Sequence, residues 1–169
     1  MLRWLFNIIC GLTNFFIFSP PKKMSVKFIL LADDDVDDQM LFQDAVDEIA
    51  GDIRIRTVYS GEQLMRLLTR SDAVLPDLIF LDLNMPMKSG HECLEEIRSN
   101  DKLKHIPVAI FSTSVSNADV DKSMYGGANV YIRKPGNFSK LKDVISKVIR
   151  MKWDYPFSPP SRDIFLISF

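Results

Sequence analysis

The chain has little of what marks nucleic-acid binding, disulfide frameworks or zinc sites. Its 169 residues carry a formal net charge of −1, and no basic run is longer than Lys22-Lys23, so no nucleic-acid partner is expected. The two cysteines, Cys10 and Cys93, lie far apart and form no Cys-x-x-Cys or Cys/His spacing. This pattern argues against a disulfide framework and a structural zinc site, and it favours a reducing, cytoplasmic setting.

The first 24 residues differ from the rest of the chain. Trp4 to Phe18 is mostly apolar and is followed by Lys22 and Lys23, but as a helix it would span roughly 22 Å, short of the ~30 Å hydrocarbon core. A membrane anchor, a signal peptide and an upstream start-site artefact with Met24 as the true start all remain open. We prefer the artefact to the anchor, and we expect membrane contact only if residues 1–24 insert.

From Lys27 onward, short apolar stretches alternate with helical patterns. The apolar stretches cover residues 28–32, 53–58, 78–81, 108–111 and 130–132, and a helical pattern follows each of them. Five such units are too few to close an eight-stranded barrel, so we predict an α/β fold with an open, doubly wound, five-stranded parallel sheet. Residues 25–152 are expected to form this domain. Residues 153–169, rich in proline and aromatics without a period, are expected to be a loosely packed tail.

Polar side chains follow the predicted strands at their carboxyl ends. Asp33 and Asp34 follow the first strand, and Asp82 follows the third. Ser112 ends the fourth strand, and Lys134 comes after the fifth. Because the carboxyl ends of parallel strands lie side by side, three carboxylates, a hydroxyl and an ammonium are expected to share one pocket.

Such a pocket needs a cation. Two carboxylates ~4 Å apart repel by about 4 kcal/mol at an effective dielectric near 20, and Lys134 offsets only one charge. Asp carboxylates and a backbone carbonyl are ligands that suit Mg²⁺. Metal, ammonium and hydroxyl together form a phosphoryl-binding set, in which Asp82 is the expected nucleophile and forms an aspartyl phosphate.

Four motifs carry a family resemblance. They lie at residues 30–35 (Leu-Leu-Ala-Asp-Asp-Asp), 81–86 (Leu-Asp-Leu-Asn-Met-Pro), 111–114 (Phe-Ser-Thr-Ser) and 131–135 (Tyr-Ile-Arg-Lys-Pro). In this order and spacing they resemble the motifs of the response-regulator receiver domain, and the match covers Lys27 to Met151. The resemblance implies a flavodoxin-like sheet with strand order 2-1-3-4-5.

The resemblance also implies a role for each matching residue. It makes Asp82 the phospho-acceptor and Lys134 the phosphoryl clamp. Mg²⁺ would be held by Asp34 directly, by Asp33 through water, and by the backbone carbonyl of Asn84. Ser112 would be the switch hydroxyl, at a position that is more often Thr, and Tyr131 would be the aromatic that changes rotamer with it.

The expected function is that of a stand-alone, chemotaxis-regulator-like receiver in two-component signalling. Asp82 would take a phosphoryl group from a sensor histidine kinase or a phosphotransfer protein, and the chain would then switch its binding to an unknown downstream protein. His91 and His105 have no partner spacing and are expected at the surface, so the phosphoryl group should come from another protein. No enzymatic turnover is expected beyond Mg²⁺-dependent self-phosphorylation from a phosphodonor, and no output domain is expected after Met151.

Other readings stay open. The chain could be a receiver-like interaction module that works without phosphate. It could also be a phosphohydrolase of the haloacid dehalogenase type with Asp33 as nucleophile, although no Thr stands at position 37 and Asp82 would have no role. Taken singly, Asp82 could cap the helix near Ser89, and Asp37 and Asp38 read as a solvated helix start.

Overall fold

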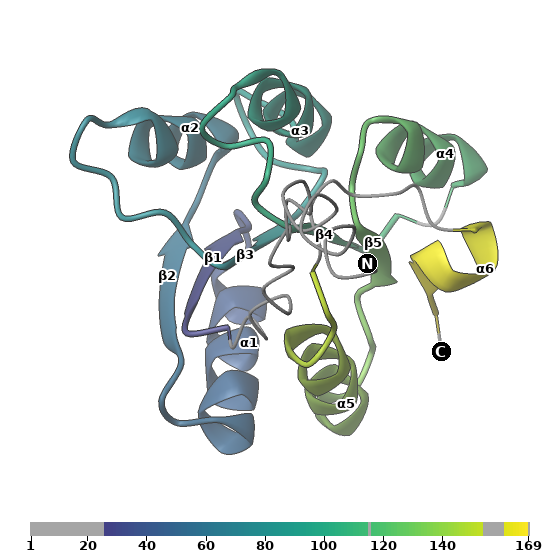
Figure 1. Ribbon diagram of the computed structural model, residues 1–169. Helices are drawn as coiled ribbons and strands as arrows, with labels where there is room; N and C mark the ends of the chain where they lie inside the picture. The colour runs from purple at the N-terminus through teal and green to yellow at the C-terminus, as the bar shows by residue number, and fades with distance from the viewer. Residues whose placement is uncertain (1–25, 115, 154–160, 169) are drawn as a thin grey trace, which may run out of the picture.

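Strands and helices alternate through most of the chain in the computed structural model, which describes residues 26–114, 116–153 and 161–168. The strands are β1 (Phe28–Ala32), β2 (Arg54–Val58), β3 (Leu78–Leu81), β4 (Val108–Ser112), β5 (Val130–Arg133) and β6 (Leu166–Ile167). The helices are α1 (Val36–Ile49), α2 (Gly61–Thr69), α3 (Gly90–Ser99), α4 (Asn117–Tyr125), α5 (Phe138–Ile149) and α6 (Arg162–Phe165) (Figure 1). The anchor, signal-peptide and start-site hypotheses concern residues 1–24, which lie outside the described residues.

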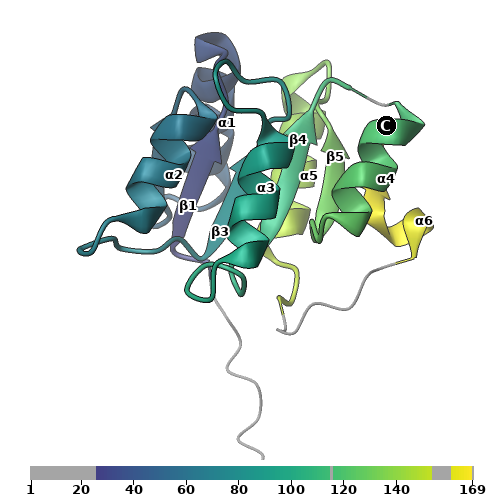
Figure 2. The same cartoon turned by 90° about the horizontal axis from the view of Figure 1, so that it is seen from above.

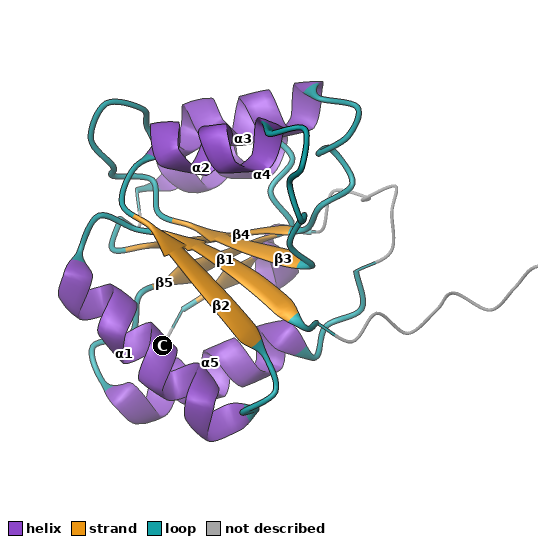
Figure 3. Cartoon of the chain, turned by 90° about the vertical axis from the view of Figure 1, so that its left-hand side faces the viewer, coloured by secondary structure: helices purple, strands orange, loops and turns teal. Residues whose placement is uncertain are grey.

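The strands form one parallel sheet with the order β2-β1-β3-β4-β5-β6. Helices α1 and α5 cover one face, and α2, α3 and α4 cover the other (Figures 2 and 3). The predicted α/β doubly wound fold and the order 2-1-3-4-5 are therefore confirmed. The predicted strand count of five is wrong, because β6 adds a short sixth strand beside β5.

The burial of each strand explains its sequence. The strands β1, β3 and β4 are buried along their whole length, which is why they read as continuous apolar runs. Strand β2 lies at the edge of the sheet and exposes Arg54 and Arg56. Two core clusters fill the space between the sheet and its two helix layers, and Phe42, Phe80 and Phe111 pack edge to face in one of them.

Side-chain caps fix the helices that begin close to the carboxyl edge of the sheet. Asp35 is the N-cap of α1 and accepts hydrogen bonds from the amides of Asp37 and Asp38. Ser89 and Glu92 form a capping box at the start of α3. These caps set where the chain leaves the sheet after β1 and after Asp82, and so they position the loops that carry the polar residues.

The C-terminal segment differs from the expected loose tail. In residues 161–168, the side chain of Phe165 is completely buried, and Leu166 and Ile167 pair with Tyr131 and Ile132 of β5. The expectation of loose packing is therefore wrong for these residues. A one-turn helix and a two-residue strand are too short to produce a sequence period, which is why the pattern did not reveal them. Within the described part of the chain, no helix is long and apolar enough to cross a membrane.

Candidate functional site

The carboxyl edge of the sheet gathers the predicted polar residues because the backbone ladder continues past the strand ends. The amide of Asp33 donates to the carbonyl of Val58 at 3.0 Å, and the amide of Asp82 donates to the carbonyl of Ala32 at 2.9 Å. The amide of Lys134 donates to the carbonyl of Ser112 at 2.9 Å. These hydrogen bonds fix the backbone of Asp33, Asp82 and Lys134 at the ends of neighbouring strands, and so they fix where the three side chains begin.

Lys134 lies at the centre of this edge. Its ammonium nitrogen is 2.7 Å from Asp33 Oδ2, 2.7 Å from Asp38 Oδ2 and 3.0 Å from Asp82 Oδ2. Only 8% of the Lys134 side chain is exposed, and the side chains of Asp33 and Asp82 are still less exposed. One buried ammonium thus joins carboxylates from β1, α1 and β3.

Asp38 is a site residue that the sequence interpretation missed. It does lie in the acidic first turn of α1, as expected of a solvated helix start, but its carboxylate also pairs with Lys134. Asp38 is the third residue after the N-cap Asp35, so its side chain stands one turn along from the end of β1 and can reach the same pocket. Helical spacing from the N-cap was the signal that could have indicated this contact.

The carboxylate of Asp33 is the most deeply buried acid of the site. Its Oδ1 accepts a hydrogen bond from the amide of Asp35 at 3.1 Å. Its Oδ2 is buried, and its partner among the described residues is the ammonium of Lys134, 2.7 Å away. Burial raises the pKa of Asp33 to about 6, although the nearby ammonium of Lys134 opposes this shift.

Burial alone would lower the pKa of Lys134, but the opposite occurs. Hydrogen bonds to Asp33 and Asp38 and the charge of Asp82 raise the pKa of Lys134 above its ordinary value. Lys134 therefore stays charged at any physiological pH and places a permanent ammonium at the carboxyl end of β3.

The acidic residues fit a divalent cation. One carboxylate oxygen each of Asp33, Asp34 and Asp82 can be chosen so that all lie within 4.8 Å of one another. Asp34 is exposed, whereas Asp33 and Asp82 are buried, so a cation would meet two fixed oxygens and one accessible oxygen. The buried Oδ2 of Asp33 shares its ammonium with two other carboxylates, and it is the kind of hard oxygen that Mg²⁺ or a similar ion takes as a direct or water-bridged ligand. Asn84 is exposed nearby, and its amide donates to Asp82 Oδ1 at 3.3 Å; the ligand role of its carbonyl stays a prediction.

Ser112 and Tyr131 lie beside the acidic pocket, on β4 and β5. The Oγ of the buried Ser112 accepts a hydrogen bond from the amide of Ser114 at 3.4 Å. The Tyr131 ring is fully buried, and its hydroxyl donates to the carbonyl of Ser114 at 2.8 Å. Burial raises the pKa of the Tyr131 hydroxyl to about 12. In this state Tyr131 is thus a core residue that points inward.

Asp119 of α4 ties the loop after β4 to α3. Its carboxylate accepts hydrogen bonds from the hydroxyls of Ser114 at 2.5 Å and Ser116 at 2.8 Å, and these bonds hold the pKa of Asp119 below its usual value. His91 Nε2 lies 3.4 Å from the same carboxylate, and only 13% of the His91 side chain is exposed. The predicted surface position of His91 is therefore wrong, because α3 turns it toward α4.

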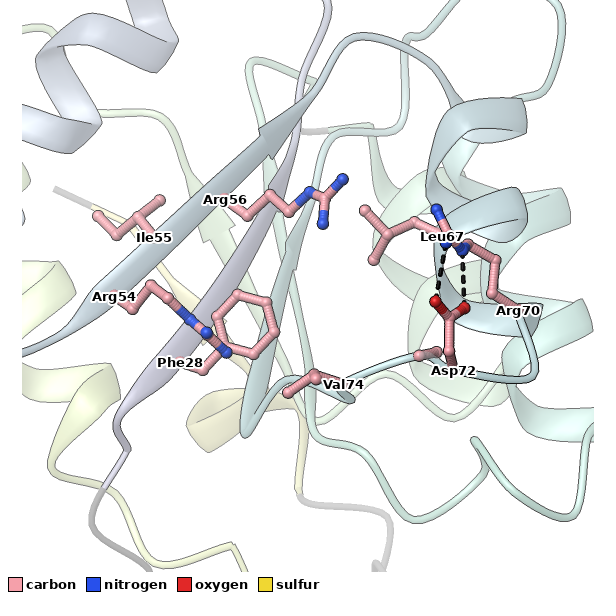
Figure 4. Close-up of a pocket in the computed structure, with 9 residues that line it drawn as sticks. Phe28, Arg54, Ile55, Arg56, Leu67, Arg70, Asp72 and Val74 are labelled. Carbon is pink, nitrogen blue, oxygen red and sulfur yellow. Dashed lines mark hydrogen bonds and ion pairs between the residues drawn. The ribbon is translucent and has the colours of Figure 1, made fainter.

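A hollow of about 340 Å³ beside β2 lies outside this site. It is lined by Phe28, the first residue of β1, and by Arg54 and Leu67 among others (Figure 4). The guanidinium of Arg54 stacks over the ring of Phe28 at 4.1 Å, and Arg70 donates two hydrogen bonds to Asp72 (Figure 4). Because Phe28 begins its strand whereas the acidic residues follow the strand ends, the hollow belongs to another part of the surface.

Fold and site together define a class: a doubly wound α/β signalling domain with an acidic, lysine-linked pocket at the carboxyl edge of its sheet. A family model described as the response regulator receiver domain matches residues 29–146. The chain belongs to the response-regulator receiver family.

Known relatives agree with this assignment. The chain is 36% identical to the response regulator Rcp1 of Synechocystis over 72% of this chain and 84% of that protein. It is 31% identical to a probable methanogenesis regulatory protein, FilR2, of Methanothrix harundinacea over 71% of this chain and 79% of that protein. Among solved structures, the phosphorylated cyanobacterial phytochrome response regulator RcpA matches with a TM-score of 0.70 at 36% identity, covering 80% of this chain and 99% of that one. The Mn²⁺-bound form of Rcp1 matches with a TM-score of 0.69 at 32% identity and the same coverage.

Proposed function

We propose that this receiver domain accepts a phosphoryl group on Asp82 from a sensor histidine kinase or a phosphotransfer protein and thereby switches its binding to a downstream protein. The single observation that carries the proposal is the position of Asp82 at the end of β3, where its carboxylate contacts the Lys134 ammonium and has an oxygen within 4.8 Å of oxygens of Asp33 and Asp34. A phosphorylated relative and a Mn²⁺-bound relative of the same fold support it.

The transfer step uses Asp82 as nucleophile. A carboxylate oxygen of Asp82 attacks the phosphorus of the donor, the phosphorus–nitrogen bond of a phosphohistidine breaks, and the imidazole takes up a proton as it leaves. Lys134, already 3.0 Å from Asp82 Oδ2, holds a positive charge against the developing phosphoryl oxygens. Each transfer modifies the chain itself once. This agrees with the expectation that the chain has no enzymatic turnover beyond Mg²⁺-dependent self-phosphorylation.

Mg²⁺ is the cation that we assign to Asp33, Asp34, Asp82 and the carbonyl of Asn84. When bound, it would neutralise the carboxylates and the phosphoryl oxygens that a single ammonium leaves uncompensated. The closeness of the three carboxylates, of which Asp33 and Asp82 share one ammonium, supports this assignment. Transfer from ATP-consuming kinases also agrees with the predicted cytoplasmic setting.

The switch would pass through Ser112 and Tyr131. In the chain without a phosphoryl group, the Ser112 hydroxyl accepts from the amide of Ser114, and the Tyr131 hydroxyl donates to the Ser114 carbonyl. A phosphoryl oxygen on Asp82 would offer Ser112 a new acceptor, and this would shift the population of the Ser112–Ser114 loop and of Tyr131. The inward position of Tyr131 is one of the two positions between which the switch would move.

Beryllofluoride, which mimics an acyl phosphate, tests the proposal. Calorimetric titration in the presence of Mg²⁺ should show binding to the native chain and to Asp37→Asn, because Asp37 is an exposed acid outside the pocket. Binding should be lost in Asp82→Asn. If the Asp82→Asn variant hydrolyses a phosphate ester with multiple turnovers, Asp33 is favoured as the nucleophile of a phosphohydrolase. If the native chain does not bind beryllofluoride, the phosphate-independent interaction module is favoured.

A further inference from the structure

The hollow beside β2 lies over the face of the sheet rather than beyond its edge. Phe28, at the start of β1, and Arg54, at the start of β2, are neighbours in the parallel register, and both line the hollow. The last turn of α2, with Leu67, and the loop that follows it, with Asp72, form the opposite wall (Figure 4). The hollow is therefore a space between the sheet and this wall, at the amino ends of the strands.

Positive charge is in excess in this hollow. The guanidiniums of Arg54, Arg56 and Arg70 line it together with a single carboxylate, that of Asp72, although the whole chain carries a net charge of −1. Arg70 and Asp72 pair with each other through two hydrogen bonds of 2.9 Å. Within the described part of the chain, neither Arg54 nor Arg56 pairs with a carboxylate. Two guanidiniums are thus available to an anionic ligand.

The hollow also offers a planar surface and an apolar surface. The guanidinium carbon of Arg54 lies 4.1 Å from the centroid of the Phe28 ring, and Arg54 is exposed, so a second planar group can stack on its outer side. Leu67 and Val74 line the hollow, and Val74 is 65% exposed. A volume of about 340 Å³ lies within the roughly 300–1,000 Å³ that is usual for small-molecule sites. Size and lining therefore suit a small molecule that combines a planar ring with an anionic group.

The geometry favours a phosphate-bearing small molecule over a peptide strand. A guanidinium presents its N–H donors in a rigid fork that matches a phosphate group bidentately. An added strand would pair with the backbone of β2 at the sheet edge. The lining of the hollow, however, includes Phe28 of β1, which is the next strand inward. A ligand that fills the hollow thus lies across two strands and contacts side chains rather than the edge of the sheet.

We propose that this hollow is a nucleotide-binding site, in which the base stacks on Arg54 and the phosphates bind Arg56 and Arg70. Asp72 lowers the affinity, because its carboxylate already occupies the guanidinium of Arg70. The site is separate from the acidic pocket, because Phe28 begins β1 whereas the acids follow the strand ends. Nucleotide binding here does not depend on phospho-acceptance at Asp82, and its failure would leave that function untouched.

ADP is the probe, and calorimetry measures its binding to the full chain in EDTA. The chelator ensures that no divalent cation attaches the phosphates to the carboxylates of the acidic pocket. One ADP should bind per chain with a dissociation constant below about 1 mM, which is about 4 kcal/mol of binding free energy. Adenosine lacks the phosphates and pyrophosphate lacks the base. Each should bind at least ~5-fold more weakly than ADP, because base stacking and a charge-assisted hydrogen bond each contribute at least that much.

Arg56→Gln removes one of the two guanidiniums that have no carboxylate partner. It should weaken ADP binding about 10-fold, the scale of a lost charge-assisted hydrogen bond. Arg66→Gln is the matched control, because Arg66 is exposed on α2 but does not line the hollow, and the net charge changes equally. It should bind ADP as the native chain does. Equal thermal unfolding midpoints would show that both variants are folded.

Asp72→Asn should have the opposite effect, because it releases the guanidinium of Arg70 and removes the only carboxylate that lines the hollow. ADP should bind this variant about 2- to 5-fold more tightly, the scale of an exposed ion pair. Glu62→Gln changes the net charge by the same amount in the first turn of α2, away from the hollow, and should not alter the affinity.

Amide chemical shifts locate the bound ADP. They should change at residues 28, 54–56 and 67–74 and remain unchanged at Asp33, Asp82 and Lys134. Four results would overturn the proposal: no ADP binding by the native chain, equal binding by the native chain and Arg56→Gln, pyrophosphate binding as tight as that of ADP, or shift changes centred on the acidic pocket.

Discussion

The ammonium of Lys134 lies 3.0 Å from Asp82 Oδ2 and 2.7 Å from Asp33 Oδ2, so a single positive charge links the ends of β3 and β1. Asp38 pairs with the same ammonium, and a carboxylate oxygen of Asp34 lies within 4.8 Å of oxygens of Asp33 and Asp82. Three carboxylates thus contact one ammonium, and the fourth, that of Asp34, lies close to two of them. Because negative charge is in excess, loss of the lysine should lower the stability of the metal-free chain, and loss of a buried carboxylate should raise it.

Replacing Lys134 by Met should destabilise the metal-free chain. The substitution leaves the buried carboxylates of Asp33 and Asp82 without their partner, which costs about 3 kcal/mol when a buried ion pair loses one member. Mg²⁺ should recover part of this loss because it restores positive charge to the pocket. Urea unfolding with EDTA and with Mg²⁺ measures both effects.

Lys142→Met is the matched control for Lys134→Met. Lys142 pairs with Glu48 on the surface between α5 and α1, and both side chains are substantially exposed. Its loss should cost less than about 1 kcal/mol and should not depend on Mg²⁺. Equal costs for the two lysines would show that the pocket does not depend on the Lys134 ammonium.

Replacing Asp33 by Asn should have the opposite effect on the metal-free chain. Asp33 is fully buried and shares the single ammonium of Lys134 with Asp38 and Asp82, so its charge is costly without a further cation. The neutral amide should raise the free energy of unfolding in EDTA by about 1–3 kcal/mol. It should also remove most of the stabilisation that Mg²⁺ gives the native chain.

Thermal unfolding of Asp33→Asn and Asp37→Asn, each with EDTA and with Mg²⁺, measures this difference. Asp37 is exposed in the first turn of α1, and its loss should leave the Mg²⁺ response intact. A destabilised Asp33→Asn chain in EDTA would mean that Asp33 contributes structural contacts that outweigh the cost of its charge.

The buried hydroxyl of Tyr131 should make stability depend on pH in the alkaline range. Burial and the nearby charge of Asp119 raise the pKa of Tyr131 to about 12, from 10.0 in its unperturbed form. For an acid whose folded pKa is raised, the stabilisation is fully present below the unfolded pKa and is lost as pH rises. The folded chain should therefore lose about 2–3 kcal/mol between pH 10 and pH 12 because of this group.

Tyr131→Phe should lack this part of the pH dependence, whereas Tyr125→Phe should keep it because Tyr125 is 83% exposed. Urea unfolding at pH 9 and at pH 11 compares the three chains, and absorbance near the phenolate band follows ionisation. Identical pH profiles for the native chain and Tyr131→Phe would contradict the buried position of the hydroxyl.

The sequence could predict the sheet and most of the pocket because both follow from local patterns. Each buried strand is a continuous apolar run, and parallel strands must end at one edge, so Asp33, Asp82, Ser112 and Lys134 had to lie near one another. Their closeness needed no information beyond strand order. The need for a cation and the role of Asp82 as nucleophile followed from the charges of these residues, and the individual ligand, clamp and switch roles came from the family resemblance.

Features that depend on tertiary contacts escaped prediction. Asp38 reads as a solvated residue until β5 brings Lys134 to it, and His91 reads as a surface residue until α4 packs on α3. Strand β6 has two residues and exists only because β5 offers an edge. For His91 and β6 the missing partner lies far away in the chain, so no local period records it, whereas the helical spacing of Asp38 from its N-cap did hold a signal.

The last prediction concerns Gly90, the first residue of α3, where the backbone passes directly over the acceptor loop. The Gly90 amide donates to the carbonyl of Leu83 at 3.0 Å, and a Cβ added at Gly90 would lie 2.1 Å from the backbone oxygen of Asp82. Gly90→Ala must therefore displace the backbone that carries Asp82, at a cost of about 1–3 kcal/mol for overpacking, and it should weaken Mg²⁺ and beryllofluoride binding as well. Gly136→Ala is the control, because nothing lies within 4 Å of a Cβ there, and its effect on stability should stay within about 0.5 kcal/mol. Since the clash at Gly90 involves backbone atoms that no rotamer change can move, a Gly90→Ala chain with native stability and native ligand affinity would show that the acceptor loop is not held against α3.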